Sequence, residues 1–292
     1  MDLAIGRSNR GWLDRYPNLA GLLNRSLAIG LAIVACVSVF SLIAPIVLHY
    51  DAAHISSADS LSPPSLRHWF GADDLGRDVL VRVAVGYTIS LTVAIGSVLL
   101  ALAVGIPLGL IAGYAGELTD NLIMRPLDVL MAFPGILLAV IVIAIFGTGT
   151  TILTLAIGVI YIPIIARVMR ASTLVARREL YVQAALARGA SHLRIATLHV
   201  LPNSIGPVIV QASILMGIAI LLEAAFSFLG LGVRPPTPSL GLMLSAGRDF
   251  MVQSPWMVIA PGLAIMLVVL GFNLIGDGLR DRLDPRGTAQ LR

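Results

Sequence analysis

The chain contains no lysine, because all twenty of its basic residues are arginine. The phosphate-binding loop G-x-x-x-x-G-K-[ST] requires a lysine, so the chain does not carry that nucleotide-binding motif. Cysteine is almost absent as well. The single residue, Cys36, lies within an apolar stretch, which excludes a disulfide framework or a cysteine metal cluster within the chain.

Charged residues are also scarce, at 12% of the chain, whereas hydrophobic residues reach 57% and the mean hydropathy is +0.91. This composition excludes an ordinary soluble domain and predicts an integral membrane protein. Its fold is expected to be all-α, because the apolar runs reach the roughly 20 residues that a membrane-spanning helix needs. The net charge of +4 falls in segments expected to face the cytoplasm, so it gives no sign of a nucleic-acid partner.

Six transmembrane helices are predicted from the apolar runs. The first, at 26–48, is too long for a signal-peptide core and is expected to remain as an uncleaved anchor. An uncharged run inside 128–167 is too long for one helix, and the Gly-Thr-Gly-Thr sequence at 147–150 divides it into a third and a fourth span. The second, fifth and sixth spans are expected at 83–112, 205–230 and 256–275.

Arginine is distributed unevenly among the connecting segments, and this distribution sets the predicted orientation. Because loops with excess arginine stay in the cytoplasm, the tails 1–25 and 280–292 and the loop 167–203 are placed there. Segment 49–82 is then extracytoplasmic, and 83–279 forms a five-helix core that carries the loop.

The loop 167–203 is a dense polar segment, with six arginines against one acid, Glu179. A membrane protein that keeps a structured polar segment on one side is expected to offer it to a soluble partner. Excess arginine alone, however, marks the cytoplasmic side and needs no partner. The residue order inside the loop has to decide between these two interpretations.

That order predicts two short helices joined at a glycine. Residues 179–188 are rich in good helix formers, and Gly189 can end this helix in a left-handed turn. Ser191 can cap a second helix over 192–200, and Pro202 suits the first turn of the helix that follows. The product is an elbow that lies along the membrane surface.

The same segment resembles the "EAA" loop of ABC importer permeases through Gln183-Ala184-Ala185, Gly189 and Leu201-Pro202. The resemblance implies a type I ABC importer permease fold, in which the loop is a coupling element that docks into a cleft on a cytoplasmic ATPase. The two alanines are expected to keep one face of the elbow thin enough to enter a groove. Gln183 stands where the family usually has Glu, so an ion pair there is lost while the amide can still hydrogen-bond. The expected docking residues are Gln183, Ala184, Ala185, Arg188, Gly189, Ala190, Ser191, Ile195, Leu201 and Pro202.

Further motifs resemble the second membrane subunit of dipeptide and oligopeptide permeases. They lie at 68–73, 76–80, 226–232, 235–238, 247–250, 273–281 and 283–286. The resemblance implies import of di- or oligopeptides across a bacterial inner membrane, although relatives of this type also carry modified peptides or nickel and other metal chelates. It also implies a second, dissimilar permease subunit, one or two cytoplasmic ATPase subunits and an extracytoplasmic substrate-binding protein. ATP and magnesium would then belong to the ATPase, with no cofactor and no enzymatic activity in this chain.

Glu223 is the clear ionisable residue inside a predicted span. An acid in an apolar span is costly and points to a pore or to a partner group. Glu223 therefore either lines the translocation path, facing a peptide amine or an arginine of the second subunit, or pairs structurally. A secondary transporter, the alternative class of protein, would be expected to place several such residues in its spans.

Two other features have competing interpretations. Asp73, Asp74 and Asp78 lie among proline and glycine turn signals, so ordered turns are expected there rather than a cation site, for which the ligands are too few. Small residues recur every four positions at 101, 105, 109 and 113, and they allow close packing either within this chain or against a second subunit. No pair of catalytic groups at membrane depth supports an intramembrane hydrolase.

Overall fold

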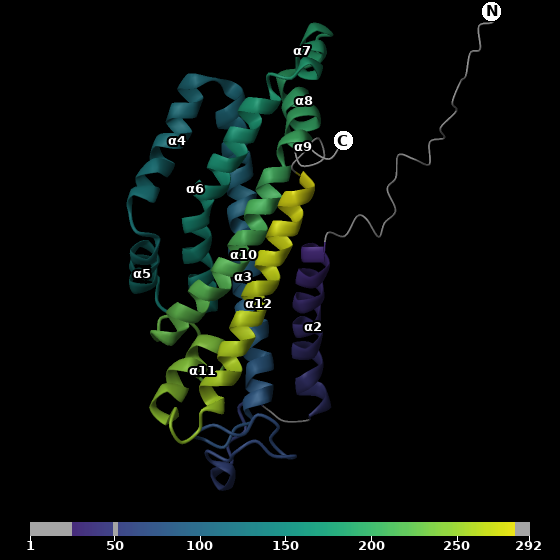
Figure 1. Cartoon of the computed structure of the whole chain (residues 1–292). Coiled ribbons are helices and arrows are strands. Elements are labelled where there is room, and N and C mark those ends of the chain that lie inside the picture. Colours follow the sequence, from purple (N-terminus) through teal and green to yellow (C-terminus); the bar gives the residue numbers. More distant parts are fainter. Residues whose placement is uncertain (1–24, 49–51, 284–292) are drawn as a thin grey trace, which may run out of the picture.

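The structure is a computed structural model that describes residues 25–48 and 52–283, and these residues form a bundle of long helices (Figure 1). Within them, five helices are long and apolar enough to cross a membrane. They are α2 (Arg25–Val47), α3 (Val79–Ala115), α6 (Thr150–Ala176), α10 (Gly206–Phe228) and α12 (Trp256–Leu283). Each overlaps one predicted span, so the first, second, fourth, fifth and sixth spans are confirmed as helices.

The third predicted span is interrupted. α4 (Glu117–Ala132) and α5 (Gly135–Phe146) meet at an angle of 89°, and only together do they have the length and apolarity of a span. The break lies at Phe133, whose backbone is extended with ψ at 140°. The cause is Pro134, since a proline ring disfavours helical geometry in the residue before it.

The two ends of the described chain lie side by side. α12 continues to Leu283, beyond the predicted end of the sixth span at 275, so Arg280 and Arg282 belong to its last turn rather than to a separate tail. A Cβ added to Gly278 would lie 2.6 Å from the Cβ of Leu27, near the start of α2. The tail residues 1–24 and 284–292 lie outside the described residues.

The stripe of small residues on α3 packs against α6 within this chain. Ala101 is fully buried, and a Cβ on Gly105 would lie 2.8 Å from the Cγ2 of Ile165. A Cβ on Gly109 would overlap the carbonyl oxygen of Ala166. These contacts require glycine, so the interpretation of the stripe as packing inside one subunit is the one that the structure supports.

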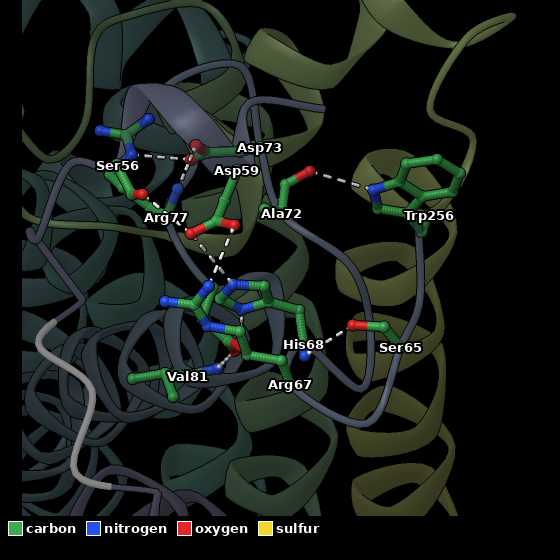
Figure 2. Close-up of polar contacts among 11 residues, drawn as sticks. Ser56, Asp59, Ser65, Arg67, His68, Ala72, Asp73, Arg77, Val81 and Trp256 are labelled. Carbon is green, nitrogen blue, oxygen red and sulfur yellow. Dashed lines mark hydrogen bonds and ion pairs between the residues drawn. The ribbon is translucent and has the colours of Figure 1, made fainter. Parts of the chain in front are cut away.

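Segment 52–78 folds into an ordered cap at the end of the bundle opposite α7 (Leu180–Ala187) (Figure 1). Asp78 caps α3 by accepting a hydrogen bond from the Val81 N–H at 2.9 Å, and its other oxygen lies 2.8 Å from Nδ1 of the buried His68. The indole N–H of Trp256 donates to the carbonyl oxygen of Ala72 at 3.0 Å, as Figure 2 shows. The cap is therefore fixed both to α3 and to the start of α12.

Asp73 and Asp78 of this cap are satisfied by groups of the protein. Asp73 accepts hydrogen bonds from the N–H groups of Leu75 and Arg77, and it pairs with Arg82 at 3.3 Å. It also pairs with the Arg77 side chain at 2.7 Å (Figure 2). Among residues 25–48 and 52–283, no group of three or more His, Cys, Asp or Glu side chains is placed to hold a metal ion. The bonds of Asp73 support the interpretation of ordered turns.

Candidate functional site

The loop after α6 folds into a helical elbow at one end of the bundle (Figure 1). It consists of α7, the short α8 (His192–Ile195), a π-helical turn (Ala196–Val200) and α9 (Leu201–Ser204). The predicted second helix over 192–200 is thus helical throughout, but it changes from α to π geometry at Ala196 and continues to Ser204.

Gly189 ends α7 as predicted. Its φ is +79°, a left-handed conformation that glycine adopts without penalty. The Gly189 N–H donates to the Leu186 carbonyl at 2.9 Å and the Ala190 N–H donates to the Ala185 carbonyl at 3.2 Å. This pair of bonds is a Schellman motif, and it fixes the direction in which the chain leaves α7.

Ser191 starts the second arm of the elbow, also as predicted. Its Oγ accepts a hydrogen bond from the Arg194 N–H at 3.4 Å, which caps α8. Pro202 lies in the first turn of α9. The two arms of the elbow are thus set by the local residues on which the prediction was based.

The elbow has a small apolar core of its own. Val182, Ala185, Ile195 and Val200 are each at most 2% exposed, and Tyr114 of α3 packs against them. The expectation that Ala185 forms part of a thin outer face needs correction, because Val182 and Ala185 lie three residues apart on the inward face of α7. Its neighbour Ala184 is exposed and keeps the expected outward position.

The elbow is attached to the end of α3 by side-chain bonds. The Arg177 guanidinium donates to the carbonyl oxygen of Gly113 at 2.8 Å, which places a cation at the carboxyl end of that helix. The hydroxyl of Tyr114 lies 3.1 Å from Nδ1 of His192 in α8. The second arm of the elbow therefore contacts α3 directly through Tyr114, and Arg177 fixes the end of α6 beside the end of α3.

Residues 167–176 of the predicted loop belong to α6, and two arginines of this segment pair with acids on α4. Arg167 lies 2.7 Å from a carboxylate oxygen of Asp128, and Arg170 makes two bonds to the carboxylate of Asp120. These contacts connect α6 to α4 close to the elbow. Much of the positive charge noted in the sequence is therefore used inside the chain.

The outward surface of the elbow is both apolar and basic. Its large exposed apolar side chains are Leu180, Tyr181, Leu186, Leu193 and Leu198. Arg178, Arg188 and Arg194 are exposed as well, and they have no carboxylate partner among the described residues. Exposed apolar surfaces of this kind are typical of sites that contact another protein or a membrane.

The predicted docking residues divide between this surface and the interior. Gln183, Ala184, Arg188, Gly189, Ser191 and Pro202 are exposed, Ala190 and Leu201 are half-buried, and Ala185 and Ile195 are buried. Gln183 donates from its amide Nε2 to the carbonyl oxygen of Arg178 at 3.2 Å. A glutamate carboxylate has no proton to donate there, so glutamine has a local role at this position.

Glu223 lies in the bundle interior on α10, remote along that helix from the elbow, and its side chain is 0% exposed. It accepts hydrogen bonds from the hydroxyls of Ser227, at 2.7 Å, and of Ser90 on α3. Ser239, which caps α11 (Leu240–Gly247), accepts a hydrogen bond from the Leu242 N–H at 3.2 Å. The bonds of Glu223 form a buried serine–glutamate cluster that joins α3 to α10. One part of this cluster is visible in the sequence, because Ser227 follows Glu223 by four residues and therefore lies on the same helix face.

Comparison with known proteins gives a consistent result. Residues 105–288 match the family described as "Binding-protein-dependent transport system inner membrane component". The dipeptide transport system permease protein DppC of Alkalihalophilus pseudofirmus is 45% identical over 275 residues, covering 94% of this chain and 90% of that protein. The glutathione transport system permease protein GsiD of Pectobacterium atrosepticum is 44% identical over 262 residues, covering 89% of this chain and 87% of that protein.

A solved structure of the MetNI methionine ABC transporter, in an inward-facing conformation, has the same fold. The TM-score is 0.56 at 18% sequence identity, and the match covers 70% of this chain and 96% of that chain. At this identity the likeness concerns the fold alone. It confirms the prediction of an ABC importer permease fold.

Proposed function

The chain belongs to the family of binding-protein-dependent transport system inner membrane components, and we propose that it is a permease subunit of an ATP-driven importer of di- or oligopeptides. The family has a transport role, so the chain is a membrane component rather than an enzyme. The proposed substrate class follows the dipeptide and glutathione permeases to which the chain is similar. The chain would form half of the translocation path in a bacterial inner membrane.

The observation that supports the coupling role is the outward surface of the elbow. Exposed leucines and unpaired arginines lie together beyond the end of the long apolar helices. A cytoplasmic ATPase with an apolar cleft and acidic groups would fit this surface. Because Tyr114 of α3 contacts His192 of the elbow and Arg177 joins the end of α6 to α3, movement of the ATPase would be passed to the membrane helices. Binding of ATP and magnesium, and ATP hydrolysis, are assigned to that partner.

The other proposed partners are a second, dissimilar permease subunit and an extracytoplasmic substrate-binding protein, in keeping with the family description. Glutathione is a modified peptide, so the similarity to GsiD favours modified peptides as a second substrate class. The family assignment gives no support to a secondary transporter. Nickel chelates serve as a comparison substrate in the uptake assay.

The proposed orientation, with both termini and the elbow in the cytoplasm, predicts opposite labelling of two exposed serines. In a Cys36→Ala background, Ser57→Cys in the cap should react with an impermeant thiol reagent in intact cells. Ser191→Cys in the elbow should react only after lysis, because it lies at the other end of helices that span the bilayer. Reaction of both positions in intact cells would contradict this orientation.

The proposed function predicts that uptake of a labelled dipeptide into proteoliposomes requires the whole complex. We expect uptake only when ATP and the substrate-binding protein are both present. Replacing the Walker-A lysine of the partner ATPase should abolish it, since that lysine holds the nucleotide phosphates. Glutathione and a nickel chelate should be measured in parallel to rank substrates. Uptake driven by an ion gradient in the absence of ATP would refute the proposal.

A further inference from the structure

A cavity lined by apolar side chains, five threonines and one arginine opens at the end of the bundle opposite the elbow. Its volume is about 670 Å³, and it lies between α3, the first turn of α6 and the segment that connects α10 to α11. α10 begins beside the elbow and runs toward the opposite end of the bundle, so residues 229–239, which follow it, lie away from the elbow (Figure 1). Cavities of roughly 300–1,000 Å³ hold small-molecule ligands, and a short peptide falls in that range.

The cavity lining carries a positive charge but no negative charge. Five threonines contribute to it, together with one charged residue, Arg234, and no acidic residue. The threonines are Thr92 of α3, Thr150, Thr151 and Thr154 of α6, and Thr237. The hydroxyls of Thr92 and Thr154 each donate to a carbonyl of their own helix at 2.8 Å, so their oxygens remain able to accept hydrogen bonds.

Arg234 differs from the other arginines at this end of the molecule. Arg67, Arg77, Arg82 and Arg248 each pair with an aspartate. Within the described ranges, Arg234 has no such partner and is exposed to the cavity.

The Arg234 side chain is nevertheless held in place. Its Nε donates to the hydroxyl oxygen of Thr148 at 2.7 Å. The terminal nitrogens of the guanidinium are left to donate, and their planar fork matches the two oxygens of a carboxylate. A fixed, unpaired guanidinium in a cavity without acids is suited to hold an anion.

We propose that this cavity is a subsite that holds a carboxylate of the peptide substrate on Arg234, while the threonine oxygens accept hydrogen bonds from the peptide N–H groups. This inference rests on the proposed function. The carboxylate comes either from the C-terminus of the peptide or from an acidic side chain, and the chemistry of the subsite is the same for both. Because the cavity lies at the end that is expected to be extracytoplasmic, it would receive the peptide before translocation.

The charge of the subsite is tested without any transport. In a Cys36→Ala background, Thr151→Cys places the sole thiol of the chain in the cavity, and its reaction rates with an anionic and a cationic methanethiosulfonate reagent are compared in the assembled complex. Adding Arg234→Gln should lower the anion-to-cation rate ratio by about fivefold or more, because a nearby positive charge is removed. Arg248→Gln is the matched control, since Arg248 is exposed at the same end but paired with Asp249, and it should leave the ratio unchanged. An unchanged ratio in Arg234→Gln would overturn the inference.

The ligand is tested by uptake of matched peptides. Two pairs of peptides are compared: a free-acid dipeptide with its C-terminal amide, and Ala-Glu with Ala-Gln. In one of these pairs, Arg234→Gln should reduce uptake of the peptide with the additional carboxylate about tenfold relative to its partner. Arg234→Lys should retain part of the wild-type preference for that carboxylate. The binding protein is the same in every assay, so its own selectivity cancels in the ratio of variant to wild type. If the uptake ratio changes for the first pair, Arg234 binds the C-terminal carboxylate of the peptide. If it changes for the second pair, Arg234 binds an acidic side chain. If wild-type protein imports peptides and neither pair responds, the subsite is refuted while the proposed function stands. If the wild type imports no peptide, the proposed function itself fails, and with it the peptide as ligand.

Discussion

Replacing Gly189 with valine is expected to abolish capture of the partner ATPase without affecting insertion of the membrane helices. Gly189 has φ at +79°, and a non-glycine residue in the left-handed region costs about 1–2 kcal/mol, with β-branched residues the least tolerated. No atom lies within 4 Å of where its Cβ would be, so the penalty comes from the backbone rather than from a clash. Relieving it would break the Schellman bonds and misdirect α8.

The expected result is normal membrane levels, loss of ATPase co-purification and loss of substrate-stimulated ATP hydrolysis. Gly230→Val is the matched control, because Gly230 has φ at +76° and equally open surroundings but lies at the opposite end of α10. It should leave ATPase capture intact. Gly189→Asn should be milder than Gly189→Val, since asparagine tolerates the left-handed conformation. Wild-type capture and coupling in Gly189→Val would show that the elbow is an ordinary connection.

Two neighbouring alanines separate folding of the elbow from docking. Ala185→Glu would bury a carboxylate among Val182, Ile195 and Val200, which is costly without a partner charge, and it should disrupt the elbow itself. Ala184→Glu adds the same group on the exposed face and should leave the elbow folded. Protease sensitivity of the loop should rise only in Ala185→Glu, whereas ATPase capture should fall in both.

The local features of the elbow were accessible from the sequence because they depend on neighbouring residues. Gly189, Ser191 and Pro202 act through conformation and capping within a few positions of themselves. The inward position of Ala185 was missed, because it depends on where the end of α3 lies. Tyr114, which packs against the elbow core, is far away in the sequence.

In the membrane bundle too, features that depend on neighbouring residues could be predicted, whereas contacts between residues far apart in the sequence could not. Hydropathy located the apolar runs and Pro134 predicts a kink in the third span, but the angle of 89° between α4 and α5 is a property of the folded chain. The Glu223–Ser227 bond links residues one helical turn apart, whereas Ser90 is 133 residues away from Glu223 and no pattern connects the two. Likewise, the positive charge of Arg234 is visible in the sequence, but the absence of an acid from its cavity is a property of the folded chain.

Replacing Glu223 with leucine is expected to reduce the yield and the thermal stability of the complex, because Glu223 joins α10 to α3. Loss of the carboxylate leaves the buried hydroxyls of Ser90 and Ser227 without their acceptor. Each buried polar group left unsatisfied costs about 1–3 kcal/mol. Glu223→Gln keeps the size and one acceptor oxygen, and its NH₂ group can donate to a serine oxygen, so it should fold nearly as well as wild type.

These two variants separate a structural role of Glu223 from a role in the translocation path. Unfolding temperature and uptake should be measured together, with Glu117→Leu as the control for an exposed glutamate. Adding Ser90→Ala to Glu223→Leu should raise the unfolding temperature above that of the single variant, because it removes one unpaired hydroxyl, and the double-mutant cycle gives the coupling directly. A Glu223→Gln protein that unfolds at the wild-type temperature but no longer imports peptide would instead place the carboxylate in the path. Because each carboxylate oxygen of Glu223 already accepts a hydrogen bond from a serine hydroxyl, the loss of stability in Glu223→Leu is the larger expected effect.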